Sequence, residues 1–363
     1  MNGFVHHTRS SRVVFGAGRV DALRDEVERL GASRVHLLAG RRISPTVSPL
    51  LGDCLAVHTD TLVQHVPVEE VDRGASLNDK YGVDAYVAVG GGSAIGLAKA
   101  FALRHPAPII AVPTTFSGSE MSAMWGTTSN GAKTTGIDDS IAPRTVIYDP
   151  DLLAGLPRAI AVTSSVNAVA HAVEALYAVD GSPLVSLIAE ESVRLLGHSL
   201  AECPSLSANT ASGWGELGFG IGARSAALEG AWLAGICLGS VSMALHHKIC
   251  HTLGGVFGLP HSDVHTVMLP FVLAYNSDAA PQAASAVARA LDDDDPARGL
   301  QNLIRRAGGP TNLASLGFGA SDIDTAVAHA IAKPYPNPRP VDADGVRSLL
   351  VAALSGSIAM LGV

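Results

Sequence analysis

Residues 86–100 read Tyr86-Val87-Ala88-Val89-Gly90-Gly91-Gly92-Ser93-Ala94-Ile95-Gly96-Leu97-Ala98-Lys99-Ala100. A β-rich run, a glycine turn and a helical run follow one another, as in units that bind phosphate at a helix N-terminus. The spacing is neither G-x-G-x-x-G nor a Walker loop, because Leu97-Ala98 stands where Lys-Ser/Thr is needed. A tight β–α turn that needs glycine only for its backbone conformation explains the glycines about as well.

A second loop adds hydroxyl groups beside this turn. Pro113-Thr114-Thr115-Phe116-Ser117-Gly118-Ser119-Glu120 directly follows the next β-rich run, so both loops are expected at the same edge of a sheet. This favours the functional interpretation. We predict that a nucleotide coenzyme binds at Gly90, Gly91, Gly92, Ser93, Thr114 and Thr115.

The rest of the chain indicates two domains. Short β-rich runs at 35–38, 86–89, 109–112 and 145–148 alternate with helical patterns, which is typical of a parallel sheet covered on both faces. After Pro157, helical segments follow one another without a convincing strand. The prediction is an α/β dinucleotide-binding domain with a mostly parallel sheet over residues 1–155 and an all-helical catalytic domain over residues 156–363.

Composition narrows the class of protein. The net charge of −8 argues against nucleic-acid binding, which needs a basic surface. The four cysteines lack CxxC spacing and are expected to be reduced thiols, and Met1–Arg12 contains no apolar signal segment. The apolar stretch Ala231–Leu245 is too short for a membrane span and is expected to be a buried core helix. We therefore expect a cytoplasmic protein with neither nucleic-acid nor membrane partners.

Histidines recur at metal-site spacing in the second half. Asn167 and His171 lie four residues apart in a helical pattern, and His247 and His251 repeat this spacing, so each pair shares one helix face. His261 follows shortly after. A divalent cation would want a carboxylate where Asn167 stands, because a neutral amide supplies no charge. His246 and His265 are expected to be structural.

The ordered motifs G-G-G-S, P-T-T-x-x-G-S-E, N-A-x-x-H-x-x-E, H-H-K-I-C-H-T-L-G-G and L-P-H resemble the iron-containing alcohol dehydrogenase superfamily, and within it the maleylacetate reductases. The likeness runs from about Val13 to the end. It implies a dehydroquinate synthase-like fold and usually a homodimer. In metal-dependent relatives, an aspartate at position 167 would bind the metal with His171, His247 and His261. The departure at Asn167 is shared with maleylacetate reductases, which work without metal.

The resemblance also implies a reaction, the reduction of the maleylacetate carbon–carbon double bond to 3-oxoadipate by NADH or NADPH in aromatic-compound catabolism, without a metal. We expect His251 and His247 to donate to the enolate and protonate its carbon, while His171 and His261 bind a carboxylate or hold the geometry. Asn167 would donate through its amide. Lys248 and Arg339 are candidates to neutralise this dicarboxylate substrate, although Lys248 is adjacent to His247 and could face away.

Two further features concern the coenzyme. Lys133 matches a lysine that lies near the coenzyme in the family. Gly40 stands where NAD-preferring relatives have an aspartate, and Arg41 or Arg42 could attract the 2′-phosphate of NADPH. Use of both NADH and NADPH is the resulting hypothesis. The alternative is that both arginines are ordinary solvated loop residues.

Three other functions stay open on the sequence. The first is a metal-dependent alcohol dehydrogenase that uses iron or zinc as a Lewis acid. The second is a lyase of the dehydroquinate synthase type, which would need more basic residues around the substrate phosphate. The third is a catalytically silent nucleotide-binding module, which would have no use for a cluster of titratable histidines.

Overall fold

The N-terminal half of the chain alternates strands with helices, as the sequence predicts. The structure is a computed structural model that describes residues 4, 6, 11–129, 132–203 and 220–362. Its first unit spans Thr8–Leu156. The elements of this unit are β1 (Arg12–Phe15), α1 (Leu23–Arg29), β2 (Val35–Ala39), α2 (Ser44–Leu51), β3 (Leu55–Thr59), α3 (Val68–Tyr81), β4 (Ala85–Gly90), α4 (Gly92–Arg104), β5 (Ile109–Pro113), β6 (Met124–Ser129), β7 (Ala132–Ile137) and β8 (Thr145–Tyr148).

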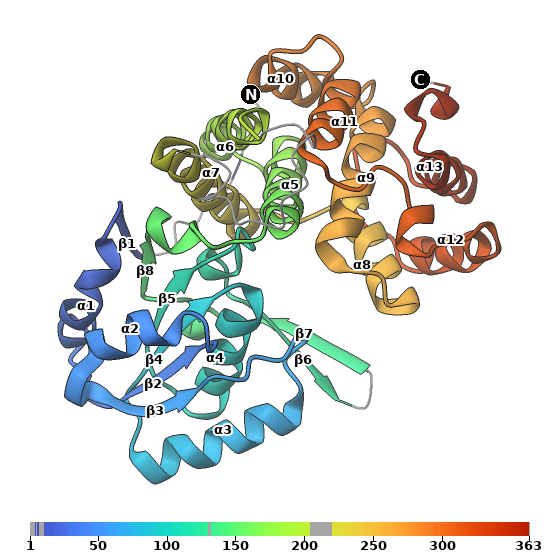
Figure 1. The fold of residues 1–363 in the computed structure, drawn as a ribbon. Coiled ribbons are helices and arrows are strands. Elements are labelled where there is room, and N and C mark those ends of the chain that lie inside the picture. The colour runs from blue at the N-terminus through green and yellow to red at the C-terminus, as the bar shows by residue number, and fades with distance from the viewer. Residues whose placement is uncertain (1–3, 5, 7–10, 130–131, 204–219, 363) are drawn as a thin grey trace. The chain divides into compact units, whose positions relative to one another are not determined.

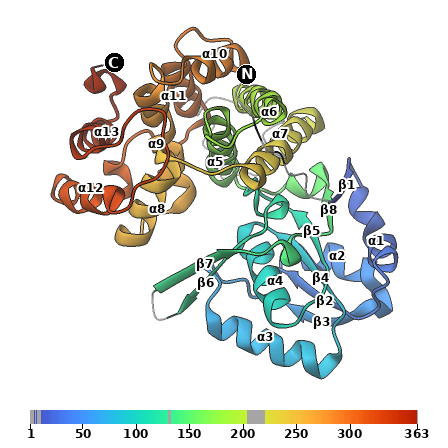
Figure 2. The same cartoon turned by 180° about the vertical axis from the view of Figure 1, so that it is seen from behind.

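Six of these strands form one sheet in the order β1-β8-β5-β4-β2-β3, and every pairing in it is parallel. Every residue of β2, β5 and β8 is buried, because helices cover both faces of a parallel sheet. The β6–β7 hairpin is a separate antiparallel pair (Figures 1 and 2). The predicted α/β domain with a mostly parallel sheet is therefore confirmed.

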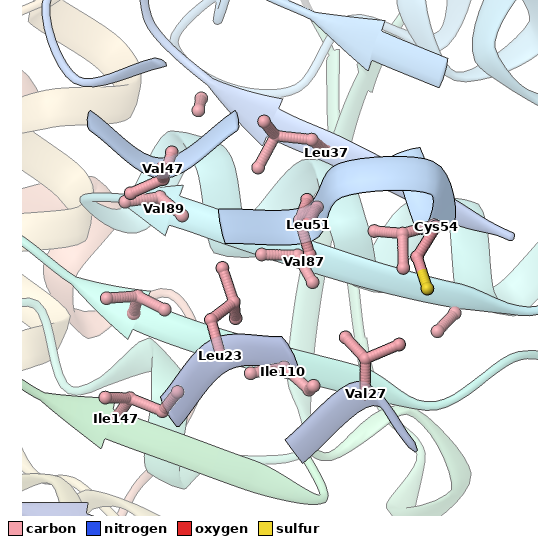
Figure 3. Packing of buried hydrophobic residues seen from close by; sticks show 14 of the residues in the cluster. Leu23, Val27, Leu37, Val47, Leu51, Cys54, Val87, Val89, Ile110 and Ile147 are labelled. Atoms are coloured by element: carbon pink, nitrogen blue, oxygen red, sulfur yellow. The ribbon is translucent and has the colours of Figure 1, made fainter. Parts of the chain in front are cut away.

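One face of the sheet packs against α1 and α2. Leu23 and Val27 of α1 and Leu51 of α2 meet Val87 and Ile110 of the central strands in one apolar cluster (Figure 3). These five side chains are fully buried, and burial of an aliphatic side chain contributes roughly 1.5–3 kcal/mol. This layer holds the central strands, whose carboxyl ends carry the two predicted coenzyme loops.

The opposite face packs against α3 and α4 through a buried aromatic cluster. The Phe101 ring of α4 lies 5.9 Å from the Tyr86 ring and stacks 5.1 Å from the His36 ring. A β-carbon at Gly74 of α3 would lie 2.0 Å from Phe101, so glycine is required where the two helices cross. This contact fixes α4, the helix that follows the glycine turn.

The four predicted strands are all present, but the sequence pattern missed β1, β3 and the hairpin. β1 and β3 are the two edge strands of the sheet and are only partly buried, so their sequences lack a continuous apolar run. The hairpin consists mostly of threonine, glycine and serine, which carry no strong alternation of polar and apolar residues.

The second unit, Pro157–Val363 together with Met1–His7, contains helices joined by turns and loops, and no strand among the residues described. Its α-helices are α5 (Arg158–Leu176), α6 (Pro183–Ala201), α7 (Ile221–Ser240), α8 (Leu245–Phe257), α9 (His261–Asn276), α10 (Pro281–Leu291), α11 (Pro296–Ala307), α12 (Ile323–Ile331) and α13 (Ala343–Ser355). The predicted all-helical domain is confirmed for these residues. Helix α5 packs against α6, α7 and α9 and is buried almost along its whole length (Figures 1 and 2).

Helix α5 is long and apolar enough to cross a membrane, but 83% of its apolar window is buried inside the structure. Burial of this kind is typical of a core helix. The pair α7 and α8 passes the same test only as one broken span bent by 95°.

The expectation that Ala231–Leu245 forms one helix is wrong. Helix α7 ends at Ser240, Val241 is extended, and α8 begins at Leu245. Two carboxylates fix the break: Asp180 accepts the Ser242 N–H at 3.0 Å, and Glu174 accepts the Ala244 N–H at 2.8 Å. The turn starts α8 in a new direction and so determines where its histidines lie.

Candidate active site

Three helices of the second unit bring the predicted histidines together. Asn167 and His171 come from α5, His247 and His251 from α8, and His261 from the first turn of α9. The His171 and His247 rings stack with centroids 5.1 Å apart, His247 and His251 are 5.9 Å apart, and His251 and His261 are 6.1 Å apart. The helical spacing therefore predicted a group of side chains that does lie together. We call Asn167, His171, His247, His251 and His261 the histidine cluster.

The histidine cluster has a buried end and an exposed end. Asn167, His171 and His247 are buried, whereas His251 and His261 are exposed. A histidine at the exposed end can exchange protons with solvent, while a polar group at the buried end is desolvated and interacts strongly with charge. The cluster thus combines a proton source with a low-dielectric binding region.

Glu174 is a site residue to which the sequence analysis assigned no role. Its carboxylate is fully buried and accepts hydrogen bonds from the backbone N–H of Ala244 at 2.8 Å, the N–H of His246 at 2.7 Å and Nδ1 of His247 at 2.7 Å. The first two bonds cap the N-terminus of α8. The third fixes the His247 tautomer, because a carboxylate only accepts and Nδ1 must carry the hydrogen.

His246 and His265 form a second layer behind these residues. His246 Nε2 lies 2.9 Å from His265 Nδ1, and both side chains are completely buried. The His265 ring is 4.9 Å from His247 and 4.4 Å from His261. The pair therefore packs directly against the histidine cluster, which the sequence pattern does not indicate.

Burial holds several of these imidazoles in the neutral form. Desolvation, reinforced by the neighbouring histidines, lowers the pKa of His171, His246 and His265 well below the ordinary value. A neutral His171 acts as a hydrogen-bonding group, not as a positive charge.

The buried end also presents polar atoms without partners. Asn167 Oδ1, His171 Nδ1, His247 Nε2 and His265 Nε2 have no hydrogen-bond partner within the described part of the chain. Leaving a buried polar atom unsatisfied costs roughly 1–3 kcal/mol, so such a group indicates a place for a polar ligand. These atoms are therefore available to the polar groups of a ligand.

The donor set does not fit the divalent cation found in metal-dependent relatives. Asn167 supplies an amide, and the carboxylate of Glu174 is already used by three N–H donors. Bringing a +2 charge into a buried site without a negative ligand is unfavourable. The histidine cluster therefore has the positions of a metal site without the charge that a cation needs.

A more compact group of possible ligands lies in the second layer. The ligand atoms of His246, Cys250 and His265 lie within 4.8 Å of one another, close enough to hold a metal ion. However, the two imidazoles are at hydrogen-bonding distance, and burial together with the nearby Glu174 raises the pKa of the Cys250 thiol well above its usual value. These contacts favour a hydrogen-bonded histidine pair beside a protonated thiol.

The glycine turn in the first unit fits a dinucleotide. A β-carbon at Gly91 would lie 2.7 Å from the Thr115 hydroxyl, and one at Gly90 would lie 2.9 Å from Ala94 Cβ. Glycine is thus required for the close approach of the two loops. Gly92 and Ser93 begin α4, and the first amides of a helix have no acceptor within it. Thr114 N–H bonds to the Gly90 carbonyl at 2.9 Å, so both predicted loops meet.

Lys99 and Glu120 stabilise the second loop from inside. The fully buried Lys99 ammonium of α4 donates to the carbonyls of Ser119 at 2.6 Å and Ser122 at 2.7 Å. Glu120 accepts from the Tyr148 hydroxyl at 3.1 Å, and burial raises its pKa to about 6. Lys99 therefore ties the hydroxyl-bearing loop to the helix that begins at the glycine turn.

Replacement of Glu120 by glutamine is expected to change how stability depends on pH. A folded pKa of about 6 against 4.5 means that the protonated carboxyl stabilises the fold below pH 4.5 and that this contribution disappears as the pH rises to about 6. The difference of 1.5 units corresponds to about 2 kcal/mol. Chemical denaturation across pH 4–7 should show wild type losing this much relative to Glu120→Gln. If wild type and Glu120→Gln lost stability equally with pH, Glu120 would not have the raised pKa. Glu69→Gln is the control, because Glu69 is exposed.

Three further predicted binding residues are Lys133, Lys248 and Arg339. Lys133 pairs with Thr128 in the hairpin, but its side chain is outside the described part of the structure. Lys248 is half-buried on α8, rotated about 100° from His247 and about 60° from His251, which lies three residues further on. Arg339 lies over the Tyr275 ring, 4.2 Å from its centroid, beside a pocket of about 410 Å³. No residue of the histidine cluster lines that pocket, so the structure does not bring Arg339 to the cluster.

Comparison with known proteins covers nearly the whole chain. The models "Iron-containing alcohol dehydrogenase" and "Fe-containing alcohol dehydrogenase family, C-terminal" match residues 10–150 and 161–354. The chain is 46% identical over 359 residues to maleylacetate reductase of Burkholderia cepacia, across 98% of this chain and 99% of that protein. It is 44% identical over 356 residues to maleylacetate reductase of Pseudomonas sp. strain P51, across 97% and 98%. The crystal structure of maleylacetate reductase from Agrobacterium tumefaciens superimposes with a TM-score of 0.91 at 40% identity, across 98% and 99%.

Proposed function

The chain belongs to the iron-containing alcohol dehydrogenase family, and from this membership we propose that its histidine cluster reduces maleylacetate with a nicotinamide coenzyme and without a metal. Maleylacetate reductase activity is supported by relatives that match over their full length. The chain is thus an oxidoreductase of aromatic-compound catabolism. The proposals that follow concern the residues, the coenzyme and the absence of a metal.

The observation that carries the metal-free proposal is Asn167. It lies one turn from His171 in the buried end of the histidine cluster, where a cation would need a carboxylate. Its amide can instead donate a hydrogen bond to a substrate oxygen. The unpartnered nitrogens of His171 and His247 lie in the same region, so polar substrate groups have several partners there.

Maleylacetate is a dianion with a carbon–carbon double bond conjugated to a ketone. A bound NADH or NADPH supplies the hydride, which adds to the alkene carbon farther from the ketone. The negative charge then resides on the ketone oxygen as an enolate. One proton added to the former alkene carbon next to the ketone gives 3-oxoadipate. Because the charge develops on oxygen, preorganised hydrogen-bond donors can stabilise it without a Lewis acid.

His247 can act as such a donor because of Glu174. With Nδ1 committed to the carboxylate at 2.7 Å, a second proton on His247 must sit at Nε2, and Glu174 balances the resulting charge. We assign His247 to the enolate oxygen and the exposed His251 to proton delivery. His171, His261 and Asn167 bind or orient the substrate. Lys248 and Arg339 are retained only as candidates for longer-range neutralisation of the carboxylates.

The coenzyme is assigned to the first unit. Gly90, Gly91, Gly92 and Ser93 are proposed to bind the pyrophosphate, with Thr114, Thr115 and Lys133 nearby. The loops fit because their backbones approach without intervening side chains. Either NADH or NADPH is expected to be used, since Gly40 places no carboxylate beside the ribose. A homodimer is proposed from the family resemblance, and sedimentation velocity tests it. A cytoplasmic location is proposed from the cysteines, which lack CxxC spacing and are expected to be reduced thiols.

Loss of NADH absorbance tests the proposed function. Oxidation should occur with maleylacetate but not with simple aldehydes or diols, and it should be unchanged after dialysis against a strong chelator. The reason is the donor set at Asn167, which holds a cation weakly. Elemental analysis should give iron and zinc well below one atom per chain. Aldehyde turnover that is lost on chelation would instead support a metal-dependent alcohol dehydrogenase.

A further inference from the structure

The neighbouring strands β4, β2 and β3 end at the same edge of the sheet, where the glycine turn follows β4. In the parallel sheet, β2 lies between β4 and β3, with Ala39 opposite Val89 and Leu38 opposite Thr59. The residues that follow these strands, Gly40, Asp60 and the glycine turn, therefore lie at one edge. A dinucleotide whose pyrophosphate binds at the turn extends its adenosine ribose along this edge.

The segment after β3 packs against the glycine turn. A β-carbon at Gly90 would lie 3.8 Å from the Leu62 side chain, and one at Gly96 would lie 3.1 Å from Val66. Thr128 of the hairpin holds the segment, because its N–H bonds to the Val66 carbonyl at 3.0 Å. Val66 has a φ of 48°, which is unfavourable for a β-branched residue and persists only where surrounding contacts enforce it. Asp60 lies at the start of this segment, two residues before Leu62, which is the residue that reaches Gly90.

Asp60 forms an ion pair with Arg41. Arg41 Nε lies 2.8 Å from Asp60 Oδ2, and the two side chains are 81% and 40% exposed. Arg41, followed by a hydrogen bond from Thr61, holds the pKa of Asp60 below its usual value. An ion pair this exposed contributes little to stability, so either partner can be exchanged for a ligand group at small cost.

The neighbouring residues single out this pair. A β-carbon at Gly40 would meet nothing within 4 Å, so the space at the end of β2 is open. Arg42 points elsewhere, since a β-carbon at Gly155 would lie 3.6 Å from its guanidinium. Arg41 is therefore the arginine that shares this edge with an acceptor carboxylate.

We propose that Arg41 and Asp60 are the residues that let one site accept both NADH and NADPH. With NADPH, the 2′-phosphate takes the guanidinium of Arg41 from Asp60, because a phosphate carries more charge and offers bidentate geometry. With NADH, the pair stays intact. Asp60 Oδ1 accepts from the Thr61 hydroxyl at 3.1 Å, and a carboxylate oxygen can accept a second hydrogen bond, here from the ribose hydroxyl, so that Asp60 replaces the carboxylate missing at Gly40. This inference rests on the coenzyme assignment of the proposed function.

Coenzyme binding in the absence of substrate tests the proposal. Fluorescence titration of the full-length chain with NADH and with NADPH gives the Kd of each. Arg41→Gln should weaken NADPH binding roughly tenfold and leave NADH within twofold, since one charge-assisted hydrogen bond to phosphate is lost. Asp60→Asn should weaken NADH and leave NADPH equal or tighter. Arg42→Gln, the matched control one residue away, should leave both within twofold.

Salt provides a second measurement on the same proteins. NADPH binding to wild type should weaken more steeply with ionic strength than NADPH binding to Arg41→Gln, because an exposed charge contact is screened. An unchanged NADPH/NADH ratio in Arg41→Gln, or equal loss of both coenzymes, would overturn the proposal. If wild type bound neither coenzyme, the coenzyme assignment itself would fall. Absence of maleylacetate turnover with intact binding ratios would contradict only the proposed function.

Discussion

Replacement of His251 by alanine is expected to lower kcat for maleylacetate by roughly 10² to 10⁴-fold, the contribution typical of general acid catalysis. His251 lies at the exposed end of the histidine cluster, next to His247 on one side and His261 on the other, so it can deliver a proton and recover it from solvent. An alanine side chain carries no proton that it could donate. Coenzyme affinity should stay nearly unchanged, because the glycine turn belongs to the other unit of the chain.

Steady-state kinetics with separate NADH titrations would measure both quantities. His329→Ala is a suitable control, since His329 is also an exposed histidine on a helix of the same unit but lies on α12, outside the cluster. A His251→Ala enzyme within twofold of wild type would remove His251 from the mechanism. A large rise in the NADH Kd would mean that His251 acts in coenzyme binding instead.

Replacement of Asn167 by aspartate is expected to convert the cluster into a metal site. The new carboxylate would stand one turn from His171 in the buried end and offset part of a +2 charge that four neutral groups cannot offset. The variant should acquire close to one zinc or iron per chain. Maleylacetate reduction should fall at least tenfold, because the cation would occupy the imidazole nitrogens that otherwise bind substrate.

Elemental analysis and NADH oxidation, each before and after chelation, would test this expectation. Asn302→Asp introduces the same charge at an exposed position on α11 and should remain metal-poor and active. An Asn167→Asp protein that stays metal-free would show that the amide is not what excludes the cation. If the wild type contained one metal ion per chain, the alternative function of a metal-dependent alcohol dehydrogenase would be supported instead.

Local periodicity predicted much of the fold and of the site. The apolar runs predicted the four buried strands β2, β4, β5 and β8, because strands covered on both faces are mostly apolar. The spacing of four placed Asn167 with His171 and His247 with His251, since helix geometry follows directly from sequence separation. The resemblance to the iron-containing alcohol dehydrogenases then joined these separate pieces into one family, which the comparisons confirm.

The missing parts depend on contacts between distant segments. Glu174 bonds to His247 across 73 positions, and no local pattern reveals that a buried carboxylate caps another helix. Asp60 follows an edge strand with little apolar signal, so its position beside the coenzyme loop became visible only from the sheet order. Arg339 was chosen for its charge, yet its guanidinium stacks on Tyr275. The charge of a side chain does not show in which direction it points in the fold.

The double role of Glu174 restricts how this protein can evolve. The same carboxylate starts α8 and orients His247, so a mutation at this position changes folding and turnover together. A substitution of Glu174 that alters substrate use would therefore also remove the cap of α8. A substitution at Asn167 changes the chemistry of the cluster without breaking a helix cap, because its side-chain oxygen has no partner among the described residues. In a directed-evolution library, the chemistry should diverge at the amide while the glutamate stays invariant.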